Sequence, residues 1–435
     1  MLNYSQVEIA EADLTKAARY MFWLMFRNVA SDGLVFDDPV NNGIISRPGC
    51  VLASPSWENT ATHVTQDYVY HWTRDAAIVA VELSAAYAAG TLPDNQPLID
   101  YVTFSQTCQQ SQGDFDRASF HIDGTQRPWT GQTDGPALQT VALLTMYRQL
   151  DAPAQATAAT LIGANLDFLQ GAYQGQTWNL WEEEFGYSFF ARSAQLRCLQ
   201  AVAANTVGIA IPDWLPAAMT WLTSALDQHW NGQYYQSMLP VPADYRAPYD
   251  PNIDIVQAAI YGAESVTDTR LLATAAQLRD QWSDPDSKYF YPVNGADAAA
   301  RIIGPLLGRY PGDLYDGDTD ALVGDHPWAL TTANFAELYY RLAAKIISSR
   351  TIPADSLSAR FYAQAGIDQG SASPLDAAAA LRAAGDSMLQ AIVFHSDHFE
   401  LSEQFDAVNG FEKSVANLSW SYAAFLSAIR AGGLA

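Results

Sequence analysis

The chain has 435 residues, and its 23 Lys and Arg against 47 Asp and Glu give a formal net charge of −24. Charged residues make up only 16% of the chain, below the roughly 25% usual for soluble domains, so the acidity reflects a shortage of Lys and Arg. This balance argues against a nucleic-acid-binding protein, which carries a basic stripe, and against a polybasic membrane-surface protein.

Apolar residues recur with helical periodicity along most of the chain. Residues 335, 338, 339 and 342, for example, are apolar and fall at i, i+3, i+4 and i+7, the stripe of an amphipathic helix. Capping residues or first-turn prolines mark helix starts at 134–136, 151–153 and 326–327. The pattern predicts about twelve helices, near residues 8–28, 75–90, 95–112, 135–150, 153–171, 186–206, 213–229, 253–262, 269–283, 328–348, 373–393 and 413–431. The clearest strand candidate is Gly232 to Val241.

No linker rich in Pro, Gly or Ser divides the chain. We therefore expect residues 1–435 to form a single domain, an all-α toroid of six helix pairs. The segments between the helices are long, aromatic and acidic, and long loops in a compact domain are uncommon unless they are functional. They predict a binding face at one end of the helical scaffold, built from residues 29–73, 114–133, 172–185, 286–327 and 395–410.

The three cysteines are too few for a disulfide framework, and their spacing matches no zinc site, so we expect them in the core. The N-terminus has no basic segment before its short apolar stretch, and no run of apolar residues is long enough to span a membrane. We expect no signal peptide, and a cytoplasmic or periplasmic location is favoured over secretion.

Three adjacent carboxylates follow Trp181, in the segment Asn179-Leu-Trp-Glu-Glu-Glu-Phe-Gly186. Like charges side by side and an apolar wall each raise a carboxyl pKa, which favours a general acid near neutral pH. The alternative is a solvated acidic turn stabilised by the dipole of the following helix.

A second acidic and aromatic segment, His398 to Asp406, contains Glu403, which could activate water. Glycoside hydrolysis needs two carboxyl groups that flank the scissile bond, one to protonate the leaving oxygen and one to activate water or attack. A third segment, Tyr68-Val-Tyr-His-Trp-Thr-Arg-Asp75, offers polar groups for sugar hydroxyls and flat aromatic surfaces for sugar C–H faces.

These segments, in this order, resemble the catalytic domain of the glucoamylases, glycoside hydrolase family 15. The resemblance covers nearly the whole chain and rests on GIISRPGCVLASPS from Gly43, YVYHWTRDAAIV, WTGQTDGPALQT, LWEEEFGYSFFARSAQLRCL, GRYPGDLY, HPWAL and SEQFDAVNGFEKSVANLSWSYAAFLSA. It implies an (α/α)6 barrel with long active-site loops. It also implies an exo-acting, inverting hydrolase that releases β-D-glucose from the non-reducing ends of α-1,4-glucans, with α-1,6 linkages cleaved more slowly.

The resemblance implies a role for each matching residue. Glu182, the first Glu after Trp181, is the expected general acid, and Glu403 is the expected general base. Arg74 and Asp75 are expected to hold the hydroxyl groups of the terminal glucose. The other residues expected to bind substrate are Tyr68, Trp72, Trp129, Leu180, Trp181, Glu183, Arg309, Trp328 and Trp420.

The chain departs from the family pattern at three places. Glu184 extends the acidic run, the segment after Trp129 is one residue shorter, and the loop from Tyr315 to Asp325 is longer and more acidic. That loop begins like a calcium-binding loop but lacks the following Gly and the final Glu, so we expect a solvated loop, no metal and no cofactor.

Two alternatives stay open within and outside this class. The same barrel could hydrolyse α-1,6-glucans or trehalose, depending on the loops around residues 114–133 and 310–327. A non-catalytic glucan-binding protein should have lost Glu182 or Glu403, and both are present. We expect a monomer that acts on an α-glucan, with neither nucleic acid nor membrane as a partner.

Overall fold

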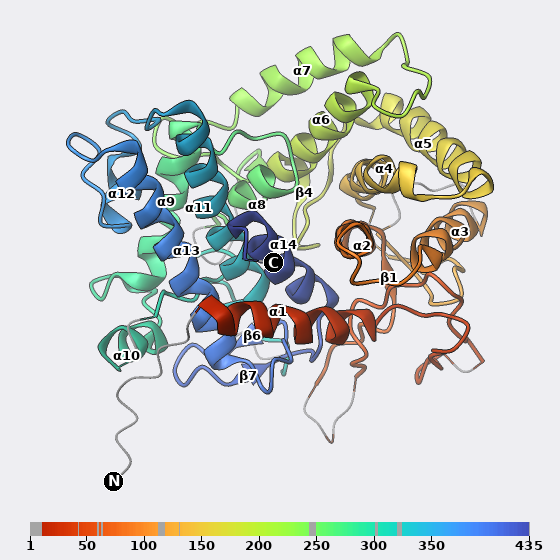
Figure 1. The fold of residues 1–435 in the computed structure, drawn as a ribbon, viewed down its shortest axis with the longest axis horizontal. Coiled ribbons are helices and arrows are strands. Elements are labelled where there is room, and N and C mark those ends of the chain that lie inside the picture. Colours follow the sequence, from red (N-terminus) through yellow and green to blue (C-terminus); the bar gives the residue numbers. More distant parts are fainter. Residues whose placement is uncertain are drawn as a thin grey trace.

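The computed structural model describes residues 11–41, 43–58, 61, 64–111, 118–129, 131–242, 249–300, 303–319 and 324–434. Within these residues, six helices form an inner ring (Figure 1). Each contacts the next along the chain, and the last returns to the first, so the ring is closed. The inner helices are α2 (Thr73–Ala88), α4 (Asp134–Met146), α6 (Phe189–Ala204), α8 (Asp254–Ile260), α11 (Ala329–Ser349) and α14 (Ser419–Gly432).

Outer helices alternate with the inner ones along the chain and pack around them. They are α1 (Glu11–Phe26), α3 (Gln96–Ser111), α5 (Ala152–Ala172), α7 (Leu215–Asp227), α9 (Thr269–Ser283) and α13 (Pro374–His395). This alternation is an (α/α)6 barrel, which confirms the expected fold class. The short helices α10 (Pro292–Ala300) and α12 (Ala359–Gln364) were not predicted, because each is too short for a clear apolar period. The predicted helix at 135–150 ends in a short 3-10 helix, η1 (Tyr147–Gln149).

Inner and outer helices differ in how they are buried. Along α11 every side chain from Ala329 to Tyr340 is buried, as expected for a helix packed on all sides. In α5 the buried residues recur every three or four positions, from Ala154 to Leu169, so only one face packs inward. The three cysteines are buried, as expected. None of the described helices combines the length and apolarity needed to cross a membrane.

Asp151 and Asp134, which mark two of the predicted helix starts, form different kinds of contact. The Asp151 side chain caps α5 by accepting a hydrogen bond from the Ala154 amide at 2.9 Å, with Pro153 in the first turn, as the sequence predicted. At the start of α4 the capping position is Thr133, and the Asp134 carboxylate instead accepts a hydrogen bond from Arg74 at 3.3 Å. Asp134, which the sequence indicates as a helix start, therefore forms a tertiary contact with Arg74.

Short antiparallel strands fix the segments that precede inner helices. They are β1 (His71–Trp72) with β2 (Ser119–Phe120), β3 (Thr177–Trp178) with β4 (Phe185–Ser188) and β5 (Met238–Leu239), and β6 (Gln404–Phe405) with β7 (Glu412–Lys413). Two helices predicted from residues 186 and 413 begin later, at Phe189 and Ser419, because the first residues pair as β4 and β7. The strand candidate at 232–241 contributes only β5 and an isolated bridge between Trp230 and Tyr235.

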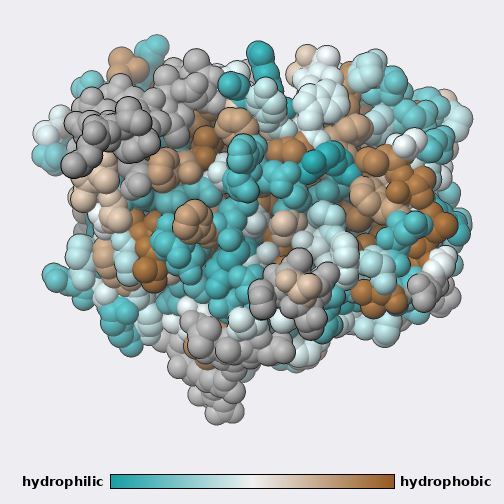
Figure 2. All heavy atoms as spheres, turned by 90° about the horizontal axis from the view of Figure 1, so that it is seen from below, coloured by the Kyte–Doolittle hydropathy of each residue, from teal (hydrophilic) through white to brown (hydrophobic). Residues whose placement is uncertain are grey.

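On the face seen in Figure 2 hydrophilic residues occupy the middle, and smaller hydrophobic patches lie towards the sides.

Candidate functional site

Residues from widely separated segments surround one pocket of about 160 Å³ at the end of the barrel where the inner helices begin. Twelve of the thirteen predicted site residues line it, and Trp129 lies beside it, hydrogen-bonded to Glu182. The lining residues are Ala53, Tyr68, Trp72, Arg74, Asp75, Leu180, Trp181, Glu182, Glu183, Arg309, Tyr315, Trp328, Leu330, Glu403, Leu418 and Trp420.

The expected acid, Glu182, lies in the tight loop between β3 and β4. Asn179 organises this loop: its side-chain oxygen accepts the amides of Glu183 at 2.9 Å and Glu184 at 3.2 Å, and its carbonyl accepts the Glu182 amide at 3.0 Å. Glu182 has a φ of 64°, in the left-handed region, where a non-glycine residue is strained by about 1–2 kcal/mol. With this backbone conformation, the Glu182 carboxylate points towards Trp72 and Trp129.

Nitrogen donors hold the Glu182 carboxylate. The Trp72 indole donates to Oε1 at 2.8 Å, the Trp129 indole donates to Oε2, and the Gln132 amide contacts Oε1 at 3.3 Å. Gln132 also donates to the Asn179 carbonyl at 2.9 Å, which ties it to the loop below. These bonds orient the carboxyl group at the pocket wall, where a proton could pass to a bound substrate.

Hydroxyl donors hold the expected base, Glu403, which precedes β6. Tyr68 donates to Oε1 at 3.0 Å, while Tyr315 and Ser414 donate to Oε2 at 2.9 and 2.5 Å. Burial raises the pKa of Glu403, and these hydrogen bonds oppose that rise because they favour the ionised form. The arrangement suits a carboxylate that accepts a proton from water.

A buried polar cluster lies at the start of α2. Arg74 donates to Gln132 at 2.6 Å and to Asp134 at 3.3 Å, and its Nε lies 3.4 Å from Asp75 Oδ2. Among the described residues, Arg74 Nε, Asp75 Oδ2 and Trp328 Nε1 are buried without a hydrogen-bond partner. Burial raises the pKa of Asp75 to about 6, against the opposing charge of Arg74. Arg74 Nε and Asp75 Oδ2 form an ion pair with each other but no hydrogen bond, and a buried polar atom without a hydrogen bond is costly unless a ligand or water satisfies it.

Glu183, next to the expected acid, belongs to a separate ion network. Arg309 donates to Glu183 at 2.7 Å and grips Asp313 through two bonds of 2.7 Å, and Tyr310 donates to Glu183 at 3.0 Å. The Arg309 guanidinium also lies about 5 Å from the ring centres of Trp181, Tyr315 and Trp328. Two adjacent carboxylates thus have different environments, one held by indoles and one paired with an arginine.

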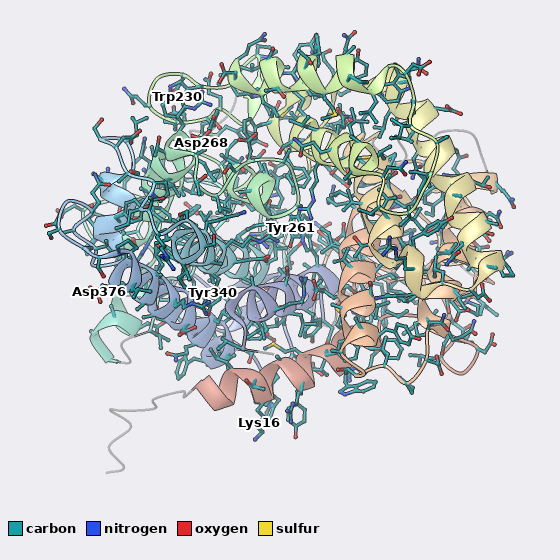
Figure 3. All side chains as sticks on the ribbon, turned by 45° about the horizontal axis from the view of Figure 1, so that its top comes forward. Lys16, Trp230, Tyr261, Asp268, Tyr340 and Asp376 are labelled. Atoms are coloured by element: carbon teal, nitrogen blue, oxygen red, sulfur yellow. The ribbon has the colours of Figure 1, made fainter. Side chains whose placement is uncertain are left out.

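Aromatic side chains form the remaining walls. Trp181 donates to Asn252 at 3.1 Å, and Trp420 donates to the Tyr261 hydroxyl at 3.2 Å. In Figure 3 Tyr261 lies near the middle of the ring of helices, whereas Trp230 lies at its periphery. The two indoles are therefore held by side chains at opposite ends of α8, Asn252 before it and Tyr261 after it.

Several residues that the structure brings to the site were not predicted from the sequence. Tyr315 and Ser414 contact Glu403, and Gln132, Asn179 and Arg127 support Glu182 or the indoles that hold it. The first four stand inside or beside the quoted motifs, but nothing in their spacing shows which carboxylate they meet. Only the fold brings residue 414 or 315 to residue 403.

The acidic loop from residue 315 to 325 is described only in part, since residues 320–323 lie outside the described segments. Lys413 donates to Asp316 at 2.9 Å, and Asp318 accepts the Ser414 amide at 2.8 Å. A lysine thus pairs with one of these aspartates. No cluster of three or more His, Cys, Asp or Glu side chains suited to a metal ion occurs among the described residues.

Comparison with known proteins places this chain among carbohydrate-active enzymes. The family model of glycosyl hydrolases family 15 matches residues 23–430. The glucoamylase of Blastobotrys adeninivorans is 26% identical over 93% of this chain and 71% of its own length. A probable glucoamylase of Schizosaccharomyces pombe is 25% identical over 93% of this chain and 88% of its own length.

Solved structures share the fold. The glucoamylase from Saccharomycopsis fibuligera superposes with a TM-score of 0.78 at 24% identity, over 97% of this chain and 95% of that one. The family 15 glucoamylase from Hypocrea jecorina gives 0.79 at 24% identity, over 97% of this chain and 72% of that one.

Proposed function

The chain belongs to family 15 of the glycosyl hydrolases, and we propose that it is an exo-acting, inverting glucoamylase that releases β-D-glucose from the non-reducing ends of α-1,4-glucans and malto-oligosaccharides. The observation that carries this proposal is the pocket itself. It is lined by two carboxyl groups with different surroundings, Glu182 and Glu403, together with buried polar atoms that lack hydrogen-bond partners. We further propose that the chain acts as a single catalytic domain and as a monomer.

Size and polarity support a terminal glucose as the occupant. A cavity of about 150 Å³ holds a single benzene ring, so a pocket of about 160 Å³ has room for roughly one pyranose ring. In our proposal Arg74 Nε and Asp75 Oδ2 bind hydroxyl groups of that ring, and Trp181, Trp328 and Trp420 pack beside its C–H faces. A pocket for one ring favours attack at chain ends over attack within a chain.

The proposed reaction uses one carboxyl group for each proton transfer. Glu182 gives its proton to the glycosidic oxygen as the bond to the anomeric carbon breaks. Glu403 takes a proton from a water molecule, which attacks the anomeric carbon from the opposite face and inverts its configuration. Each carboxyl group thus ends in the other's initial protonation state, and solvent restores both. Inversion predicts a separation of roughly 6.5–9.5 Å between the two groups, and about 5 Å would indicate a retaining enzyme.

Proton NMR of fresh products tests the proposal most directly. The protein is incubated with maltose, maltoheptaose, isomaltose and trehalose, and the anomeric signals are followed before mutarotation. We expect maltose and maltoheptaose to be hydrolysed fastest and β-glucose to appear first. Initial α-glucose would reject inversion, and faster turnover of isomaltose or trehalose would move the assignment to another linkage. No turnover of any of the four would favour a glucan-binding protein.

A further inference from the structure

The guanidinium of Arg127 lies among three aromatic rings at the edge of the pocket. It is 3.7 Å from the ring centre of Tyr70, 4.0 Å from that of Trp129 and 5.0 Å from that of Trp72. Burial lowers the pKa of Arg127, against the opposing effect of nearby acidic groups that include Glu182. A partly desolvated cation on aromatic faces is a strong contact, because the rings replace lost water.

Two of these three rings hold the expected acid. Trp72 and Trp129 donate their indole N–H groups to the two different oxygens of Glu182. Arg127 therefore contacts both of the indoles that help to orient this carboxylate.

The two indoles differ in how firmly the fold holds them. Trp72 is 7% exposed and lies in β1, paired with Ser119 of β2. Trp129 is 48% exposed and lies outside any helix or strand. Its orientation must therefore depend on a few side-chain contacts, and Arg127 supplies one of them.

Arg127 itself is anchored to the buried β1–β2 pair. Its Nη1 donates to Ser119 Oγ at 3.2 Å, and residues 119–126 fold back on themselves through the bridge between Phe120 and Gln126. Only Pro128 separates it from Trp129 in the chain, and the two side chains lie against each other, with the guanidinium 4.0 Å from the ring centre. Arg127 thus links the β1–β2 pair to the exposed indole.

We propose that Arg127 is a positioning residue for the general acid: its cation holds the indoles of Trp72 and Trp129 so that both N–H groups meet Glu182. This inference rests on the proposed function, since it assigns Arg127 a task in protonating the leaving oxygen. Arg127 belongs to no motif on which the family resemblance rests.

The kinetic consequence depends on the leaving group. Cleavage of maltose expels a sugar oxygen that needs a proton, so a misplaced Glu182 should slow it. Cleavage of α-D-glucosyl fluoride expels fluoride, a much weaker base that leaves with little help from an acid. A positioning defect should therefore be severe with maltose and small with the fluoride.

The variants Arg127→Met and Arg127→Lys test this. Met retains length without charge, and Lys retains a cation. We expect Arg127→Met to lower kcat on maltose about tenfold to a hundredfold, since small misplacements cost up to about a hundredfold. KM should change little, kcat on the fluoride should fall less than threefold, and Lys should restore part of the loss. An equal loss on both substrates, or no loss on maltose, would overturn the proposal. Arg19→Met, on the exposed face of α1, is the matched control.

An NMR readout tests the contact without turnover. The Trp72 and Trp129 indole N–H signals are assigned with Trp→Phe variants in a ¹⁵N-labelled protein. We expect both signals to shift in Glu182→Gln, and the Trp129 signal to shift in Arg127→Met but not in Arg19→Met. An unmoved Trp129 signal in Arg127→Met would refute the positioning role. Failure of the wild type on both maltose and glucosyl fluoride would instead refute the proposed function, whatever the indole signals do.

Discussion

The two sides of the pocket hold their carboxyl groups by different means. Glu182 lies on a strained loop, is held by nitrogen donors and depends on the half-exposed Trp129. Glu403 is 2% exposed and precedes a paired strand. Among the described residues, the hydroxyl groups of Tyr68, Tyr315 and Ser414 donate to it. The difference matches the proposed roles, because an acid must reach the substrate oxygen whereas a base must hold one water in place.

Removing either carboxyl group should have the largest effect. Glu182→Gln and Glu403→Gln should each lower kcat on maltose by about 10²–10⁴-fold, the usual contribution of a general acid or base. On glucosyl fluoride the two should separate, with Glu182→Gln largely restored and Glu403→Gln still impaired. Initial rates of glucose release measure both. Glu184→Gln, the same change two residues away and outside the pocket lining, should be near wild type. Equal behaviour of the two variants on the fluoride would contradict the assignment of acid and base.

Removing one hydrogen-bond donor from each carboxyl group should distinguish the acid from the base. Tyr315→Phe removes a hydroxyl from buried Glu403, and Trp129→Phe removes an N–H from Glu182 at an exposed position. We expect kcat on maltose to fall about tenfold in each, because one hydrogen bond contributes about 0.5–1.5 kcal/mol, and somewhat more at the ionised Glu403. Only Trp129→Phe should recover on glucosyl fluoride. Full activity in Tyr315→Phe would show that Glu403 does not need this donor.

Ser414→Ala should move the acidic limb of the pH–rate profile. The pKa of Glu403 is raised by burial and lowered by its hydrogen bond from Ser414. Without that bond the ionised base is less stable and its pKa rises, so activity is lost at higher pH as the solution is acidified. We expect the acidic limb of the kcat/KM profile to move to higher pH by about one unit, since one pKa unit corresponds to about 1.4 kcal/mol. A shift to lower pH, or none, would contradict an ionised Glu403 as base.

The smallest expected effect is on the free energy of unfolding, and it comes from the left-handed backbone at Glu182. Asn tolerates left-handed backbone better than Gln does. Glu182→Asn should therefore exceed Glu182→Gln in free energy of unfolding by up to about 1 kcal/mol, measured by urea denaturation. Both should be nearly inactive. The matched pair Glu403→Asn and Glu403→Gln lacks this constraint and should show no such preference for Asn. If Asn were more stabilising than Gln at both positions, backbone strain at Glu182 could not be the cause.

Much of the fold could be predicted because helical periodicity is a local property. Each of the twelve predicted helices has a counterpart among the described residues, which do not include residues 8–10 of the first. The errors in these helices lie at their ends, where residues 186–188 and 413 form strands instead. A strand needs a partner from elsewhere in the chain, so periodicity along one segment cannot show it. The predicted site residues lie together for a simpler reason: their motifs precede inner helices that all begin at one end of the barrel.

The sequence by itself determined the helical barrel, the acidic and aromatic loops, and the set of carboxylates that could carry chemistry. Only the tertiary structure decided the environment of each one. Among three consecutive glutamates, Glu182 has a left-handed backbone in the loop held by Asn179, and its carboxylate meets the indoles. Its neighbour Glu183 instead pairs with Arg309. Likewise Tyr68, Tyr315 and Ser414 reach Glu403 only because the closed ring brings the segments before its inner helices together. Composition and spacing encode which groups are available, but their hydrogen-bond partners depend on contacts between distant segments.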